Sequence, residues 1–356
     1  MVEAQEVFLP YSSDHSKPFT PNTTMSYPST PHPNSSPALS SHVLPLSASL
    51  DTDGKVDVAL TTPGLRWLLF GGEGWIGSQL RCILSTERPC DEVVVALSRA
   101  DDDVSVEEEL RMVQPDRVVS LVGRTHGEEF ATIDYLEQKG KIMENVRDNL
   151  FGPLVLLSAC LKAGVHLTYV GTGCIFEYDD DHPINVSPSH GFTEFDKPNF
   201  FGSSYSVVKG FTDRLFHLLP STALNARIRM PITDHRHARN FITKITSYTK
   251  ICSMENSMSV LPELLPIMVR MAVDKETGTV NLTNPGHITH NKILELYRDI
   301  VDPTFTWSNF TIEEQSKILA AGRSNNYLNT DRLQKYAPNV RSIEESVKFV
   351  LLRYNK

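Results

Sequence analysis

A short apolar run followed by three spaced glycines constrains the fold of this chain more than any other feature. The run Arg-Trp-Leu-Leu-Phe-Gly at 66–71 has the composition of a buried parallel strand, and Gly74 and Gly77 follow Gly71 before a helical pattern. Glycines so placed permit a tight turn and the close approach of a pyrophosphate, to which the amino end of the helix offers N–H donors. We expect a dinucleotide-binding unit here, with a simple tight turn as the alternative.

Strand and helix signals keep alternating after this unit. Apolar runs at 92–97, 118–122, 166–171 and 226–230 are typical of further strands, and the helical patterns between them include a long one at 135–162. Strands that alternate with helices form parallel sheets with helices on both faces. The predicted fold class is α/β: a Rossmann-like doubly wound parallel sheet with a smaller C-terminal substrate lobe and a disordered N-terminal tail.

The composition along the chain predicts its domains. Residues 1–63 are rich in Ser, Pro and Thr and hold too few apolar side chains to offset the entropy of ordering, so we expect a disordered tail. Residues 64–232 are expected to form the cofactor-binding Rossmann domain, to which 276–300 returns. Residues 233–275 and 301–356 are expected to form the substrate-binding lobe.

Bulk properties exclude some classes of function. The formal charge is -9 without a basic run, which argues against a nucleic-acid partner. The five cysteines are scattered without CxxC spacing, which indicates a reducing compartment and no metal site. No apolar run has membrane-spanning length, and no signal peptide is visible, so we expect a cytoplasmic protein without a membrane partner.

The residue after the second strand bears on cofactor choice. Arg99 stands where an acidic side chain would bind the ribose 2′-OH of NAD, and an arginine there suits a 2′-phosphate. This position favours NADPH. The acidic run at 101–103 lies close by, so NADH stays open as the alternative.

A hydroxyl, a thiol and a Tyr-xxx-Lys pair follow the strand at 166–171. Thr172 and Cys174 come directly after it, and Tyr205 and Lys209 stand one turn apart on the helix predicted at 203–219. We expect the ammonium to depress the pKa of the phenol, which would then donate a proton to a carbonyl undergoing reduction. Cys174 has a plainer alternative as a buried core thiol.

Two other segments are candidates for substrate contact. The basic segment 234–245 carries Arg239 and Lys244, which could meet the phosphates of a nucleotide-bearing substrate or lie in an ordinary surface loop. The polar segment 179–199 is predicted to lie over the mouth of the site. Arg124 and His126 follow the third strand, where ligands bind in open α/β sheets.

The combined motifs resemble the extended short-chain dehydrogenase/reductase family, and more narrowly the bifunctional nucleotide-rhamnose synthase/epimerase-reductases. The resemblance runs from about Leu65 to the C-terminus. It is carried by Gly-Trp-Ile-Gly at 74–77, Thr-Gly-Cys-Ile-Phe-Glu-Tyr-Asp at 172–179, Asp-Lys-Pro-Asn-Phe at 196–200, Arg-Met-Pro-Ile at 229–232, Arg-Asn-Phe-Ile-Thr-Lys at 239–244, Thr-Asn-Pro-Gly at 283–286 and Arg-Ser-Asn-Asn at 323–326.

The resemblance implies an enzyme, its substrate and its residue roles. The substrate would be UDP- or dTDP-4-keto-6-deoxy-glucose, which the family epimerises at C3 and C5 and then reduces at C4 with NADPH. Cys174 and Lys244 would move protons, and Tyr205, Thr172 and Lys209 would serve the reduction. The remaining implied contacts are Gly71, Gly74, Trp75, Ile76, Gly77, Tyr205 and Lys209 to the cofactor, and Arg239, Asn240 and Arg323 to the substrate.

Other functions and partners stay open from the sequence. The alternatives are a related sugar-nucleotide reductase, a GDP-fucose-type synthase, and a non-catalytic NADP(H)-binding regulatory subunit. A separate 4,6-dehydratase is the expected source of substrate, because only one dinucleotide-binding unit is visible. A homodimer is compatible with the fold.

Overall fold

The computed structural model describes residues 64–127, 130–184, 190–219 and 221–354, with the backbone of two short strands before them. These strands, β1 (Ser49–Leu50) and β2 (Val56–Asp57), pair antiparallel within a unit that ends at Thr61. The rest of the predicted tail at 1–63 lies outside the described residues. The helices and the other strands belong to the second unit, which begins at Thr62.

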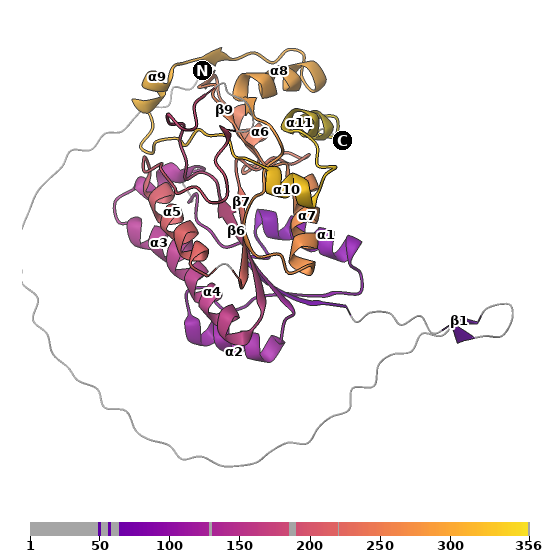
Figure 1. Cartoon of the computed structure of the whole chain (residues 1–356). Helices are drawn as coiled ribbons and strands as arrows, with labels where there is room; N and C mark the ends of the chain where they lie inside the picture. The colour runs from indigo at the N-terminus through magenta and orange to yellow at the C-terminus, as the bar shows by residue number, and fades with distance from the viewer. Residues whose placement is uncertain are drawn as a thin grey trace, which may run out of the picture. The chain divides into compact units, whose positions relative to one another are not determined.

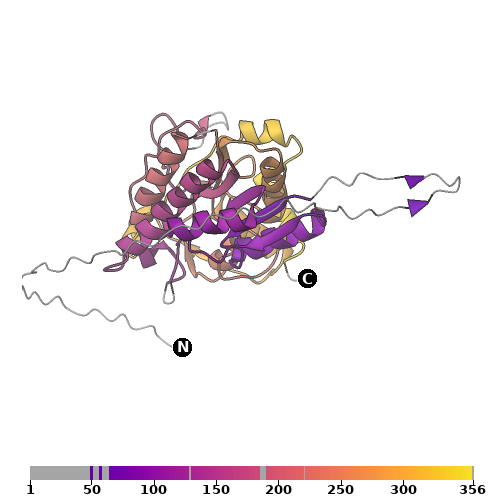
Figure 2. The same ribbon diagram turned by 90° about the horizontal axis from the view of Figure 1, so that it is seen from below.

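A six-stranded parallel sheet forms the centre of this unit (Figures 1 and 2). Its order is β10-β7-β6-β5-β3-β4, and every neighbouring pair is parallel, which confirms the predicted doubly wound sheet. The chain starts at β3, adds β4 on one side and then crosses to β5 on the other. The strands are β3 (Arg66–Phe70), β4 (Glu92–Val95), β5 (Arg117–Ser120), β6 (His166–Thr172), β7 (Ala223–Ile228) and β10 (Gly278–Asn281).

Helices cover both faces of the sheet because side chains alternate along each strand. Trp67 and Leu69 of β3 pack in one core with the helices α1 and α7, and Leu68 and Phe70 pack in the opposite core with α2 and α4. Helix α10 joins the first core, and α5 joins the second. The helices are α1 (Trp75–Glu87), α2 (Asp103–Val113), α4 (Gly152–Ala163), α5 (Ser204–His217), α7 (Leu261–Val273) and α10 (Asp331–Tyr336).

The long helix predicted at 135–162 begins later, at Ile142, and from there continues to Ala163. A 3-10 turn η1 (Ile133–Glu137), a short helix α3 (Ile142–Val146) and a π-helical turn η2 (Arg147–Phe151) precede α4. Gly140 adopts φ +83°, which ends helical geometry between η1 and α3. The side chain of Asn149 in η2 bonds both the backbone N–H and the carbonyl of Arg124 after β5.

A second hydrophobic cluster lies beyond the carboxyl ends of the strands. It is built from α6 (Phe241–Ile245), α8 (His290–Ile300) and α11 (Ile343–Leu351). Around it lie the two-stranded pairs β8 (Lys250–Ile251) with β12 (Ser308–Asn309) and β9 (Glu255–Asn256) with β11 (Ile288–Thr289), and the short helix α9 (Ile312–Ser316).

The boundary between cofactor domain and substrate lobe remains a proposal. Helix α7, which falls in the segment 233–275, packs against the sheet. Helix α8, which falls in 276–300, packs in the second cluster. Packing therefore favours assigning α7 to the cofactor domain and α8 to the substrate lobe. Among the described helices, none has the length and apolar character to cross a membrane.

A buried ion pair ties α5 to the sheet close to the carboxyl strand ends. Arg227 of β7 donates from Nε and Nη2 to the two carboxylate oxygens of Asp213 on α5, at 2.8 and 2.7 Å. The guanidinium also donates to the carbonyls of Thr193 and Glu194. Both charged side chains are nearly inaccessible, at 0% and 4% exposure, so each depends on the other for charge compensation.

Removing this arginine should therefore destabilise the fold strongly. We expect Arg227→Met to lower the free energy of unfolding by about 3–5 kcal/mol, because it leaves the buried Asp213 unpaired. The matched control is Arg66→Met on β3, whose partner Glu92 lies at 2.6 Å but with side chains 42% and 59% exposed. There the loss should stay within about 1 kcal/mol. Urea unfolding measures the free energy of unfolding of both variants. Equal losses in the two would contradict the structural role of the buried Arg227–Asp213 pair.

Candidate active site

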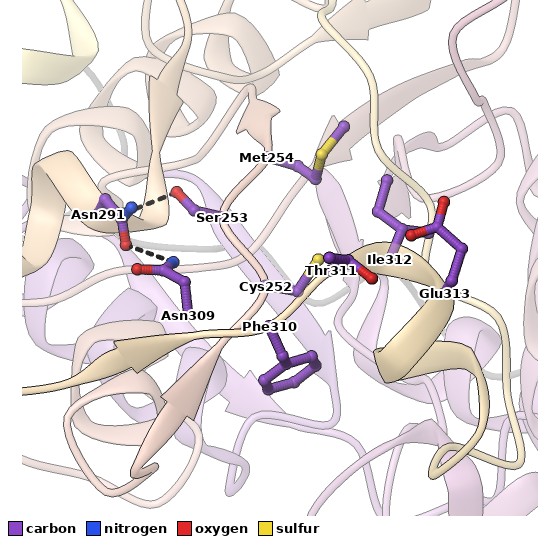
Figure 3. A pocket seen from close by; sticks show the side chains of 9 residues that line it. All are labelled: Cys252, Ser253, Met254, Asn291, Asn309, Phe310, Thr311, Ile312 and Glu313. Atoms are coloured by element: carbon purple, nitrogen blue, oxygen red, sulfur yellow. Dashed lines mark hydrogen bonds between the residues drawn. The ribbon is translucent and has the colours of Figure 1, made fainter.

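A cavity of about 1070 Å³ lies at the carboxyl ends of the strands. Its wall combines the glycine turn after β3, the segment from Val170 to Cys174, one side of α5, and segments of the second cluster. A smaller pocket of about 460 Å³ shares Cys252, Met254 and Phe310 with it (Figure 3). The large cavity thus stands where open α/β sheets bind ligands.

The glycine turn fits a dinucleotide. Gly71 has φ +81°, and its carbonyl accepts from Gly74 N–H at 3.0 Å. A Cβ on Gly77 would lie 2.3 Å from the Gly71 oxygen, so only glycine allows the helix to start this close to the strand. No side chain caps the amino end of α1, which leaves its first N–H groups for an anion. Trp75 and Ile76 also line the cavity, as the resemblance implied.

Arg99 lies apart from the residues that line the cavity. It follows β4, as predicted, but its side chain is 64% exposed and pairs with Asp101 at 3.0 Å. The contact of Arg99 with a 2′-phosphate stays a prediction.

The residues after β6 meet the start of α5. Cys174 N–H donates to Thr172 Oγ1 at 3.0 Å, and Ser206 Oγ donates to the Cys174 carbonyl at 2.8 Å. The Tyr205 side chain is buried and bonded to the Thr172 side chain. Thr172, Cys174, Tyr205 and Lys209 all line the cavity, so the structure brings together the four residues that sequence spacing singled out.

The pKa of Tyr205 is raised, whereas the expected attraction of Lys209 would have depressed it. Burial raises the pKa of Tyr205, to which nearby Cys174 adds, and the Thr172 hydrogen bond only partly offsets this rise. Burial also lowers the pKa of Lys209 to about 7. The ammonium donates to the hydroxyl of Tyr169. Desolvation of both groups outweighs the attraction that the Tyr-xxx-Lys spacing predicts.

The basic segment reaches the cavity through two basic side chains, Arg239 and Lys244. Lys244 of α6 donates to the carbonyl of Ala131 at 3.1 Å, and burial, then Arg239 and Arg323, lower its pKa. Arg239 Nη2 lies 2.5 Å from Nε2 of His126, which also lines the cavity.

Asn240 does not line the cavity. It is buried as the N-cap of α6, where its side-chain oxygen accepts from the Ile242 N–H at 3.2 Å and its amide donates to the Thr233 carbonyl at 2.9 Å. Its observed role is to start the short helix that carries Lys244.

Arg323 lines the cavity but is already paired. Its guanidinium donates to the carboxylate of Asp134 and, at 2.9 Å, to the Ala321 carbonyl. Asp134 also accepts from Ala321 N–H at 3.0 Å, so it ties the loop before α3 to the C-terminal segment. Sequence reasoning missed Asp134 because its partner Arg323 lies 189 positions further along the chain.

The expected cover of the site is wrong for the described part of 179–199, none of which lines the cavity. Its residue Phe192 packs instead with Phe176 and Leu328 in a separate small core. The cavity is lined instead by segments near the second cluster. The lining residues that sequence reasoning missed include Tyr248, Met254 and Ile318, and nothing in their spacing marks them.

The glycine turn against a buried Thr–Tyr–Lys group, on a doubly wound parallel sheet, defines an extended short-chain dehydrogenase/reductase. The comparisons with known proteins narrow this class. No protein-family model matches the chain. The L780 UDP-rhamnose synthase of Acanthamoeba polyphaga mimivirus, known from a crystal structure, is 55% identical with a TM-score of 0.78, and the match covers 82% of this chain and 99% of L780.

Two relatives from Arabidopsis thaliana are also similar. A bifunctional dTDP-4-dehydrorhamnose 3,5-epimerase/dTDP-4-dehydrorhamnose reductase is 40% identical over 82% of this chain and 94% of its own length. A trifunctional UDP-glucose 4,6-dehydratase/UDP-4-keto-6-deoxy-D-glucose 3,5-epimerase/UDP-4-keto-L-rhamnose-reductase is 41% identical over 80% of this chain, which spans 41% of that relative. The chain therefore belongs to the family of bifunctional nucleotide-rhamnose epimerase-reductases.

The burial of Lys209 predicts an unusual titration. We expect its ammonium to lose its proton near pH 7, because burial penalises the charged form, and to be protonated below that pH. The control is exposed Lys162, whose hydrogen bond and attraction to Glu107 raise its pKa. ¹³Cε NMR of labelled lysines measures both, with Lys209→Met for assignment. A Lys209 midpoint near 10 would show that the site is far wetter than the structure indicates.

Proposed function

We propose that this chain epimerises UDP- (or dTDP-) 4-keto-6-deoxy-glucose at C3 and C5 and then reduces C4 with NADPH, which yields the nucleotide L-rhamnose. One observation carries the proposal: a single cavity is lined both by Cys174 and Lys244 and by Thr172, Tyr205 and Lys209. The first pair suits proton transfer, and the second group suits reduction of a ketone. The activities named for L780 and the Arabidopsis relatives support the same reading.

The epimerase half rests on the acidity of the carbons beside a ketone. The C4 carbonyl spreads the charge of an enolate onto O4, so a base can remove the C3 or C5 proton and an acid can return one on the other face. Cys174 follows β6, whereas Lys244 belongs to α6 of the second cluster, so the two groups come from different walls. The lowered pKa of Lys244 increases its neutral fraction, which can accept a proton.

The reductase half rests on Tyr205 as proton donor. The nicotinamide, when bound, supplies the hydride for C4. The raised pKa keeps the Tyr205 phenol protonated near neutral pH, so it holds the proton that the developing alkoxide needs. Thr172 is bonded to the same phenol and would polarise O4, and Lys209 would bond the nicotinamide ribose.

Arginine side chains support the choice of cofactor and substrate. Arg99 after β4 favours the 2′-phosphate of NADPH over NADH, with Asp101 as the side chain it would have to leave. Arg239 and Arg323 in the cavity wall would bind the diphosphate of the sugar nucleotide. We propose UDP ahead of dTDP because the L780 relative is named for UDP-rhamnose.

The proposed reaction requires a 4-keto-6-deoxy sugar made elsewhere. We propose that a 4,6-dehydratase on a separate chain supplies it, since the trifunctional relative is named for that activity as well and this chain spans only 41% of it. The five cysteines are all free, which supports the cytoplasm as the proposed location.

Deuterium uptake separates the two half-reactions. With the UDP-linked keto sugar in D₂O, the protein should place deuterium at C3 and C5 and oxidise NADPH faster than NADH. Cys174→Ala should lose exchange by about 10²–10⁴-fold, whereas Tyr205→Phe should keep exchange and lose reduction by a similar factor. Exposed Cys90→Ala is the control for loss of a thiol and should match the wild type.

Product NMR and cofactor oxidation read out each outcome. Absence of both exchange and NADPH oxidation would falsify the proposed function and leave the regulatory subunit as the alternative. Reduction without exchange would make the chain a plain reductase, and activity only with a GDP-linked sugar would indicate a fucose-type synthase. A reversed pattern in the two variants would overturn the assigned roles.

We also propose a homodimer, formed through the outer face of α3, η2 and α5. These elements are neighbours, and they expose the apolar side chains of Met143, Phe151 and Phe211. A two-fold axis would let each copy cover the same patch on the other.

Light scattering should show a dimer for the wild type and a monomer for the double variant F151E/F211E. Phe195→Glu, at an exposed apolar residue outside these elements, should leave the dimer intact, and a monomeric wild type would contradict the proposal.

A further inference from the structure

A second tyrosine lies beneath the reductive group. Tyr169 of β6 is buried, does not line the cavity, and stands three residues before Thr172. Its hydroxyl oxygen accepts a hydrogen bond from the ammonium of Lys209. The same ammonium lies 4.6 Å from the centre of the Tyr169 ring. The proposed reaction gives this residue no role.

Packing fixes the position of the Tyr169 hydroxyl. Its ring stacks on Phe216 with the ring centres 4.6 Å apart and the planes at 24°. Phe216 belongs to α5, which also carries Lys209, so the phenol is held between its own strand and the helix whose lysine it contacts. The hydrogen bond therefore joins two rigid elements of the fold rather than two mobile side chains.

The surroundings of Lys209 offer little other compensation for its charge. On α5 it lies one turn after Tyr205 and close to Asp213, and the segment after β6 brings Cys174 close to it. Both Asp213 oxygens accept from Arg227 of β7, so that carboxylate is already shared with a stronger cation. Burial raises the pKa of Tyr169 well above its ordinary value, so the phenol stays neutral and acts as an acceptor for the ammonium.

We propose that Tyr169 is a positioning residue, whose hydroxyl holds the Lys209 ammonium in place and in its charged form beneath Tyr205. An ammonium has three donors, and the bond to Tyr169 uses one, which leaves the others for the ribose and neighbouring groups. A buried ammonium without such an acceptor would release its proton more readily. The catalytic consequence rests on the proposed reduction, but the effect on Lys209 itself does not.

Two hydroxyl deletions on neighbouring residues of one strand test this inference. Tyr169→Phe keeps the ring and its stacking but removes the acceptor. Thr168→Val is the matched control, because Thr168 is equally buried, points to the other face of β6, and its hydroxyl has no hydrogen-bond partner. The ¹³Cε titration of Lys209 gives a readout that is independent of turnover.

The expected result is a shift in titration. In Tyr169→Phe the Lys209 midpoint should fall by about one pH unit, since one hydrogen bond to a charged group is lost. The pKa of the alkaline limb in the pH–rate profile of reduction should fall by the same amount. The reductase activity that Tyr169→Phe loses at about pH 7.5 should therefore be largely regained at about pH 6. Deuterium exchange at C3 and C5 should be unchanged, and Thr168→Val should match the wild type throughout.

Three outcomes would overturn the inference. An unchanged Lys209 midpoint in Tyr169→Phe would show that the hydroxyl does not hold the ammonium. If Tyr169→Phe lost reduction equally at every pH, or if Thr168→Val shifted the Lys209 midpoint by the same amount, Tyr169 would have only a packing role. If the wild type shows neither exchange nor reduction, the proposed function fails, whereas the NMR midpoints still decide the role of Tyr169.

Discussion

Removal of water from around Lys209 is the constraint on which the site depends. Packing of α5 against β6 buries the lysine together with Tyr205. The loss of solvent raises the pKa of Tyr205 and lowers that of Lys209, so it favours the neutral form of each side chain. A phenol that keeps its proton is a suitable donor for an alkoxide, so burial alone puts Tyr205 in the protonation state that a proton donor needs. The Arg227–Asp213 pair anchors α5 to the sheet and so maintains this burial.

The local parts of the fold and site could be predicted from the sequence. The glycine turn, the parallel strands and the Tyr-xxx-Lys pair depend on patterns within about forty residues, where periodicity and spacing carry the information. Cys174 and Thr172 reach the cavity because they directly follow a strand whose end lies there. The later start of the long helix, at Ile142, escaped prediction because Gly140 with φ +83° interrupts an otherwise helical composition.

The distant contacts could not be predicted, because they depend on how the folded elements meet. Tyr169 bonds a lysine 40 positions away, and Asp134 bonds an arginine 189 positions away. Asn240 shows the opposite error: an amide beside Arg239 resembles a ligand contact, yet capping of α6 uses it fully. Polar residues next to functional ones often serve to position them, and sequence alone does not separate these roles.

The tie between Asp134 and Arg323 has a consequence for the order in which the protein can become active. The cavity wall runs from Gly71 to Asn325, so it includes residues from both ends of the described sheet unit. During synthesis the dinucleotide turn can form early, since its contacts join residues within Gly71 to Gly77. The wall itself closes only when the last segment returns to the loop before α3, which makes loop closure over a long stretch of chain the final event. A ribosome-bound chain that lacks this segment would hold the reductive side chains but no enclosed site.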